Sequence, residues 1–285
     1  MTSKERVERA LRREGQDRLP VYMWFHPETA AILSRELEIP SSALDYAMGN
    51  DVRQTWVANN QAMEGIVHER EGDSHTDPWG ITWTRMHGFN QISRYPFAAA
   101  EPEAFAEFSF PYRLIDELMK PMERLAESSE GYFLGCDVSP CAFEMYWRLR
   151  GMEDTFIDMA CDTELFASVI RKSCDFAVRL SEEAFSRFHL DWLWTGDDVA
   201  SQSGLLFSPG LWREVVKPEL KRVFDVAKGR GVPVAYHCCG SLYPIIGDLI
   251  EIGMDVLNPV QPNCPGMNPP DLKKEFGSSI TFMGG

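Results

Sequence analysis

The feature that most constrains the fold is a repeated alternation of short apolar runs with longer helical patterns. Alternating strands and helices are typical of parallel βαβ units, and a closed barrel of such units takes about eight strands. The sequence therefore predicts an α/β fold, a TIM-type (β/α)8 barrel. Its seven candidate strands cover residues 19–25, 65–70, 131–135, 191–195, 232–236, 254–258 and 279–283.

The length of the chain allows one large barrel or two small domains, since it has 285 residues of which 44% are hydrophobic. No internal repeat or low-complexity linker divides it. We therefore expect residues 1–285 to form a single barrel domain. Residues 81–85 and 91–95 additionally predict the two arms of a hairpin.

The charge of the chain is strongly negative, with a formal net charge of −15 and a pI near 4.9. Such a charge argues against nucleic acid and anionic membranes as partners. The first residues lack a signal peptide, and no apolar run approaches the length of a membrane span. The seven cysteines show no disulfide framework. These features predict a protein of the reducing cytoplasm.

The segment 233–241 reads Pro-Val-Ala-Tyr-His-Cys-Cys-Gly-Ser and places one imidazole and two thiols at the end of a predicted strand. His237 and Cys239 are two residues apart, so in an extended chain they point to the same side and Cys238 points to the other. Zinc prefers nitrogen and sulfur ligands, and a tetrahedral site needs at least one more protein ligand. The alternative is that all three side chains simply pack in the core.

Polar side chains also follow the other predicted strands, and the strand exits of a barrel form its active face. Asp197 and Asp198 are candidate catalytic residues, because a carboxylate pair can orient a ligand or share a proton. Either acid alone could equally be a helix cap. The candidate substrate-binding residues share this position at strand ends and are His26, Asp137, Asn258 and Gln261.

The His-x-Cys-Gly element belongs to a wider resemblance. Together with segments 17–21, 77–83, 196–198, 248–259 and 276–285, it resembles the uroporphyrinogen decarboxylase superfamily. Within that superfamily the chain looks most like the zinc-dependent corrinoid methyltransferases and their uncharacterised relatives.

The resemblance implies a methyltransferase that moves a methyl group between a methyl-corrinoid protein and a thiol or pterin acceptor, with zinc activating the acceptor. It implies zinc on His237 and Cys239. Such enzymes take a third ligand from a cysteine near their last strand, beyond Gly285, so the chain looks truncated before that strand; Cys264 is the candidate substitute. The expected partners are a corrinoid protein and the small acceptor, and the resemblance also allows a homodimer.

Two alternatives remain. One is metal-free decarboxylation of a uroporphyrinogen-like tetrapyrrole, which needs cationic groups for many carboxylates. Decarboxylases of this superfamily carry an arginine-rich segment after their first strand, whereas residues 23–27 read Met-Trp-Phe-His-Pro, without arginine. The other is a non-catalytic protein that binds a corrinoid or tetrapyrrole.

Overall fold

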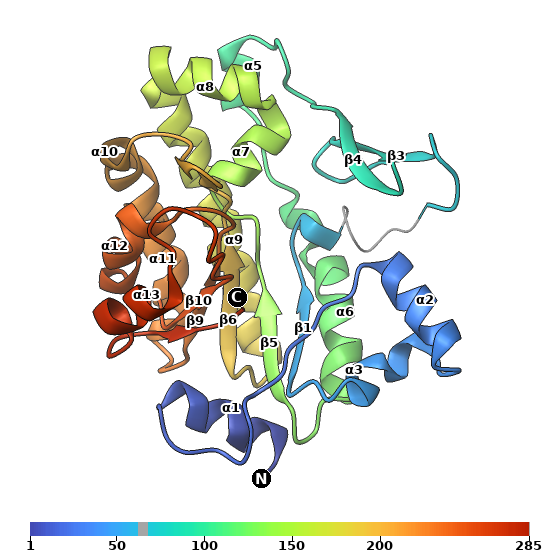
Figure 1. Ribbon diagram of the computed structural model, residues 1–285. Coiled ribbons are helices and arrows are strands. Elements are labelled where there is room, and N and C mark those ends of the chain that lie inside the picture. Colours follow the sequence, from blue (N-terminus) through green and yellow to red (C-terminus); the bar gives the residue numbers. More distant parts are fainter. Residues whose placement is uncertain (62–67, 285) are drawn as a thin grey trace.

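A six-stranded parallel sheet forms the centre of the computed structural model, which describes residues 1–61 and 68–284 (Figure 1). All neighbouring strands are parallel. In sheet order the strands are β1 (Val52–Trp56), β5 (Phe133–Asp137), β6 (Trp192–Gly196), β9 (Val234–His237), β10 (Val256–Asn258) and β11 (Thr281–Phe282).

The sheet curls around an inner core. Side chains at every second position of the strands meet there, because successive residues of a strand point to opposite faces. The Trp192 indole on β6 donates to Gln54 Oε1 on β1 at 2.9 Å, across the intervening β5. Gly135 on β5 makes this approach possible, since a Cβ there would lie 2.1 Å from Trp192 Nε1. The buried residues of the inner core are Val7, Val52, Phe133, Trp192, Trp194, Ala235 and Val256.

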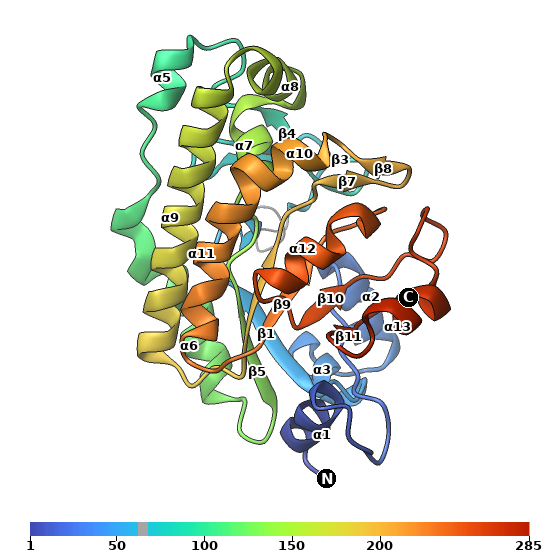
Figure 2. The same ribbon diagram turned by 90° about the vertical axis from the view of Figure 1, so that its left-hand side faces the viewer.

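Helices cover the outer face of the sheet and bury a larger core against it (Figure 2). The long helices α9 (Thr163–Arg187) and α11 (Lys217–Lys228) pack side by side. The other segments of this layer are α5 (Pro102–Ala106), η2 (Tyr112–Leu114), α6 (Ile115–Glu127), α7 (Phe143–Arg150), α8 (Met152–Cys161), α10 (Pro209–Leu211), η3 (Trp212–Val216), η4 (Tyr243–Ile245), α12 (Ile246–Glu251) and α13 (Pro269–Phe276).

A smaller lobe stands beside the sheet (Figure 1). It contains the antiparallel sheet of β2 (Ser74–Thr76), β3 (Thr82–Met86) and β4 (Phe89–Arg94), so the predicted hairpin is confirmed. Buried Asp77 holds its turn by accepting from the amides of Trp79 and Ile81 and from the Trp83 indole. The elements of the chain not yet named, in the lobe or elsewhere, are α1 (Ser3–Leu11), α2 (Pro27–Glu36), η1 (Ser41–Ala43), α3 (Leu44–Ala47), β7 (Ala200–Ser201) and β8 (Gly204–Leu205).

The first two predicted strands are not strands of this sheet. Residues 19–25 are extended but belong to no sheet, because side chains take the place of a partner strand. Asp51 Oδ2 accepts from the Val21 amide at 2.8 Å, and Asn50 both accepts from and donates to the backbone of Met23. Of the predicted strand 65–70, residues 65–67 lie outside the described residues and 68–70 are not a strand. The sheet starts instead with β1.

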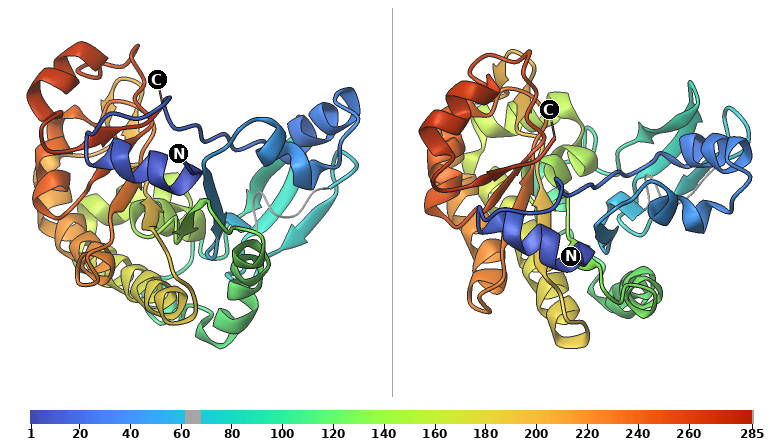
Figure 3. Two further views of the ribbon diagram at one scale, coloured as in Figure 1. Left: turned by 90° about the horizontal axis from the view of Figure 1, so that it is seen from below. Right: turned by 60° about the horizontal axis from the view of Figure 1, so that its bottom comes forward.

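The predicted barrel is not closed among the described residues. The sheet has six strands instead of the seven predicted, and its edge strands β1 and β11 do not pair with each other. Seen from below, α1 lies across the amino end of the strands (Figure 3). The described residues therefore form an open, curved parallel sheet that is covered by helices on its outer face. No helix in the described parts of the chain is long and apolar enough to cross a membrane.

A buried ion network fastens the amino-terminal segment to β1. Asp51 is fully buried and binds two guanidinium groups, those of Arg6 and Arg18. Arg6 also forms a bidentate pair with Asp17, at 2.7 and 2.8 Å. Burial alone would raise the pKa of Asp51, but the hydrogen bonds from Arg18, Val21 and Arg6 outweigh it and lower the pKa. We call Arg6, Asp17, Arg18 and Asp51 the amino-terminal clamp.

We predict that Asp51→Ala lowers the free energy of unfolding by about 3–5 kcal/mol, because it removes the buried carboxylate that the guanidinium groups of Arg6 and Arg18 share. Urea denaturation measures the change. Asp116→Ala is the control: it removes an exposed partner of Arg187 and should cost at most about 1 kcal/mol. Equal losses for the two variants would show that the clamp contributes no more than a surface ion pair.

Candidate functional site

The ends of three neighbouring strands lie level with one another on the inner face of the sheet. In the sheet register Gly196 on β6 pairs with His237 on β9, and His237 pairs with Asn258 on β10. Asp198 follows β6 by two residues and Cys239 follows β9 by two. Parallel strands deliver their carboxyl ends to one edge, so residues distant in sequence meet there.

Asp198, His237 and Cys239 form a compact cluster whose ligand atoms all lie within 4.8 Å of one another. Cys239 Sγ is 3.6 Å from His237 Nε2, and Asp198 Oδ1 is 3.9 Å from the same nitrogen. The Cys239 amide donates to Asp198 Oδ1 at 2.8 Å, and this hydrogen bond connects the segment after β9 to the segment after β6. The alternation predicted for His237 and Cys239 is confirmed, since Cys238 is buried in the outer core.

Asn258 orients the imidazole. His237 Nδ1 lies 2.8 Å from Asn258 Oδ1. A carbonyl oxygen only accepts hydrogen bonds, so Nδ1 carries the proton and Nε2 presents its lone pair to the cluster. Histidines that bind metals are commonly held in this way by a second hydrogen bond. Asn258 Nδ2 in turn donates to the Met283 carbonyl at 3.3 Å.

The cluster is acidic. Burial, and after it the negative charges of Asp198 and Glu144, raises the pKa of the Cys239 thiol to about 11. Burial and the charge of Glu144 also raise the pKa of Asp198, against the opposing effects of the Cys239 amide and His237. Glu144 was not predicted from the sequence. It lies on α7, and its Oε2 accepts from the Asp198 amide at 3.3 Å.

Asp197 serves a different purpose from its neighbour. It is completely buried and caps α7, because its two carboxylate oxygens accept from the amides of Phe143 and Glu144 at 3.0 and 2.6 Å. Burial raises the pKa of Asp197 to about 8, although these hydrogen bonds oppose the shift. The geometry therefore gives Asp197 a helix-capping role, which is the alternative to a catalytic one.

The other predicted residues are spread along the same end of the sheet. Gln261 accepts from the Gly240 amide at 2.6 Å, and Cys264 Sγ lies 3.6 Å from the same Gln261 oxygen. Cys264 is not a member of the three-residue cluster. Asp137 is buried and accepts from the amide and hydroxyl of Ser139. His26 caps α2 through Nδ1.

The donor set fits a zinc ion. It offers one imidazole nitrogen, one thiol and one carboxylate, and ligands about 2.0–2.3 Å from a tetrahedral zinc lie roughly 3.3–3.8 Å apart. The measured 3.6 and 3.9 Å to His237 Nε2 are close to this spacing. Three protein ligands leave a fourth position for another molecule, which is the arrangement of catalytic zinc sites. The side chains of His237 and Asp198 are 37% and 39% exposed, so such a molecule can approach.

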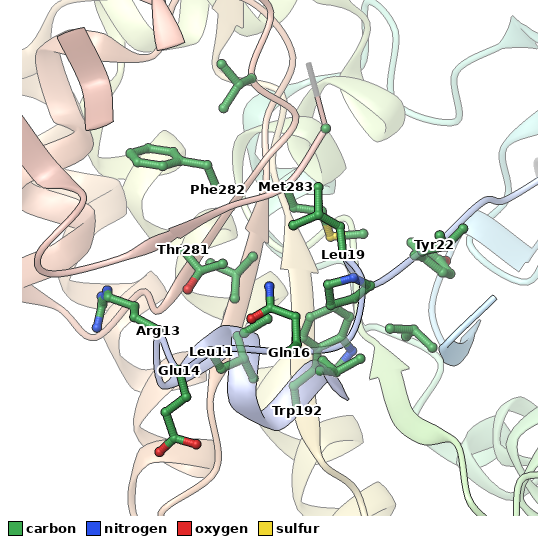
Figure 4. A pocket seen from close by; sticks show the side chains of 18 of the residues that line it. Leu11, Arg13, Glu14, Gln16, Leu19, Tyr22, Trp192, Thr281, Phe282 and Met283 are labelled. Carbon is green, nitrogen blue, oxygen red and sulfur yellow. The ribbon is translucent and has the colours of Figure 1, made fainter. Parts of the chain in front are cut away.

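A large cavity lies elsewhere. It measures about 790 Å³ and is bounded by α1, the segment leading to Tyr22 and the exposed edge of β11 (Figure 4). Asp198, His237 and Cys239 do not line it. Apolar side chains such as Leu11, Leu19 and Phe282 form most of its wall, so it has none of the chemistry found at the strand ends.

A family model and a solved structure are similar to this chain. The family model "Uroporphyrinogen decarboxylase (URO-D)" matches residues 91–285. Among solved structures, a methyltransferase from Methanosarcina mazei superposes with a TM-score of 0.60 at 16% sequence identity; the match covers 91% of this chain and 76% of that one. Among curated proteins, none matches the chain.

The neighbouring acids should respond differently to substitution by asparagine. We predict that Asp197→Asn lowers the free energy of unfolding by about 1–3 kcal/mol, because an amide NH2 would face a backbone N–H of α7. Asp198→Asn keeps the oxygen that accepts from Cys239 and should leave stability nearly unchanged, while it weakens zinc binding at least about tenfold. Thermal unfolding and a zinc titration give the two readouts. The opposite pattern would reverse the roles assigned here.

Zinc affinity should rise with pH. The raised pKa of Cys239 keeps the thiol protonated at neutral pH, so a zinc ion that binds sulfur has to displace one proton. We expect the affinity to increase about tenfold per pH unit between roughly pH 7 and 8.5. Zinc competition with a chelator of known affinity measures this slope. Cys239→Ser should fail to bind zinc at every pH in this range, and zinc binding by that variant with an unchanged slope would exclude Cys239 as the proton source.

Proposed function

The chain belongs to the uroporphyrinogen decarboxylase family, and we propose that it is a zinc-dependent methyltransferase that moves a methyl group from a methyl-corrinoid protein to a thiol acceptor. The observation that carries the proposal is the cluster of Asp198, His237 and Cys239 with a free Nε2 lone pair. Decarboxylation of a porphyrinogen needs no such donor set. Methyl transfer to a thiol does use one, since the thiol has to become a nucleophile at neutral pH.

Three side chains of the site would hold the zinc ion, and a fourth, Asn258, would position one of the three. His237 Nε2, Cys239 Sγ and a carboxylate oxygen of Asp198 are the proposed ligands. Asn258 fixes the tautomer of His237, which keeps the lone pair on Nε2. A bound zinc ion would lower the pKa of an acceptor thiol placed in the fourth position. Cys264 is the alternative third ligand; to bind zinc it would have to leave Gln261.

The acceptor thiol loses its proton, which Glu144 can receive because it lies beside Asp198 and reaches solvent. The sulfur lone pair forms the new bond to the methyl carbon, and the cobalt–carbon bond breaks with its electron pair left on cobalt. The reaction therefore needs no oxidant or reductant beyond the methyl-corrinoid itself. A pterin could replace the thiol as acceptor in the same sequence of bond changes.

The alternatives have less support. Decarboxylation of a uroporphyrinogen requires cations for the substrate carboxylates. Arg148, whose charge lowers the pKa of Asp198, is already bound to Glu144 and Asn59. A non-catalytic corrinoid carrier would not need a metal-binding cluster. We also propose that the curved sheet is the greater part of the (β/α)8 barrel that the family resemblance implies.

A direct test compares single variants of the zinc-loaded protein. We predict that wild type binds about one zinc ion per chain and transfers the methyl group of methylcobalamin, used as the donor, to 2-sulfanylethanol. His237→Ala and Cys239→Ser should lose both zinc and transfer. Cys238→Ser is the matched control and should retain both, because Cys238 lies in the outer core. Zinc content is measured by elemental analysis and transfer by the absorbance change of the corrinoid.

Two further results decide the details. If Cys264→Ser retains zinc and Asp198→Ala loses it, the carboxylate is the third ligand; the reverse result assigns that place to Cys264. If His237→Ala and Cys239→Ser match wild type in zinc content, the side chains only pack and the methyltransferase proposal is wrong. Release of carbon dioxide from a porphyrinogen by the metal-free protein would favour the decarboxylase instead.

A further inference from the structure

Asp137 lies between two tryptophans in the register of three neighbouring strands, at the same strand ends as the cluster of Asp198, His237 and Cys239. Trp56 on β1, Asp137 on β5 and Trp194 on β6 are direct register partners on three neighbouring strands. All three point inward. Gln54, two residues before Trp56, bonds inner Trp192 and reaches Asp137, and Trp194 itself belongs to the inner core.

The row formed by Trp56, Asp137 and Trp194 reaches the proposed zinc ligands. The ring of Trp194 lies 6.4 Å from the ring of His237, centroid to centroid. At its other end Trp56 is half-buried and meets Trp24 edge-on at 5.3 Å, and Trp24 is 43% exposed. The row therefore extends from the metal-binding cluster toward solvent.

The chemistry of the row favours a positive charge. Indole faces attract cations, most strongly where water is excluded, and a buried carboxylate adds charge attraction. Further acids stand close by, because Asp198 and Glu144 flank the same strand ends. The guanidinium of Arg148 forms an ion pair with Glu144 and donates to Asn59 Oδ1 at 3.0 Å. Its positive charge is therefore partly balanced by Glu144. An anionic substituent would meet net negative charge here.

We propose that the acceptor is a thiol bearing a cationic group, with its sulfur at the metal and its cation between Trp56 and Trp194 over Asp137. This inference rests on the proposed function and names the substrate class of that site. It excludes thiols whose second group is a carboxylate or sulfonate. Asp137 and the two tryptophans thereby become specificity-determining residues.

The test uses thiols of matched length that differ in charge. We expect the zinc-loaded protein to bind 2-aminoethanethiol at least tenfold more tightly than 2-sulfanylethanol, and 3-sulfanylpropanoate more weakly still, by isothermal titration calorimetry. Asp137→Asn should reduce the preference for the cation, expressed as the ratio of the affinities for 2-aminoethanethiol and 2-sulfanylethanol, to threefold or less. Trp56→Leu should weaken binding of the cation alone. Equal affinities in wild type, or tightest binding of the anion, would overturn the inference.

A second measurement separates this inference from the proposed function. Tetramethylammonium carries the charge but no sulfur, so it should quench tryptophan fluorescence of the zinc-free protein, and less so in Asp137→Asn. If zinc does not bind but the cation does, the methyltransferase proposal is wrong and the cation site remains. If zinc and 2-sulfanylethanol bind but tetramethylammonium does not, only the cation site is wrong. Asp116→Ala, far out on the surface, is the control for nonspecific charge effects.

Discussion

The strict alternation of side chains in the parallel sheet is the constraint on which the rest of the structure depends. Residues that point outward build the large core under α9 and α11, and residues that point inward build a smaller core and the site. A shift of one residue in any strand would exchange the two sets. On β9 such a shift would bury His237 and expose Tyr236, which is now completely buried. The register thus determines both stability and chemistry.

The pair Asp197 and Asp198 shows how two identical residues acquire different properties from this alternation. Asp197 is enclosed by α7 and fixes that helix, while Asp198 stays in contact with solvent and with the Cys239 amide. The capping also positions Glu144, since the capped amide is its own. A structural carboxylate therefore sets the place of an acidic group at the site. The chemistry of the cluster is in this way coupled to the start of α7.

Much of the sheet could be predicted from the sequence, because β5, β6, β9, β10 and β11 each overlap one of the predicted apolar runs. β1 could not, since its sequence Val-Arg-Gln-Thr-Trp is only partly apolar. Gln54 is satisfied by Trp192, and Arg53 stacks on Tyr132, and both contacts come from distant parts of the chain. The His237–Cys239 pair was predictable from its two-residue spacing. Glu144 was not, because it is the cap that Asp197 places on α7 that brings it to Asp198.

The two edges of the sheet differ in how they are secured, and this difference should shape local opening of the native state. On the β1 edge the amino-terminal clamp covers the strand with ion pairs buried around Asp51. On the other edge β11 pairs over only two residues, Thr281 and Phe282. Regions with few buried contacts exchange their amide hydrogens through small fluctuations, whereas core strands require global unfolding. Amide protection should therefore be highest on β5 and β6 and decline more steeply toward β11 than toward β1.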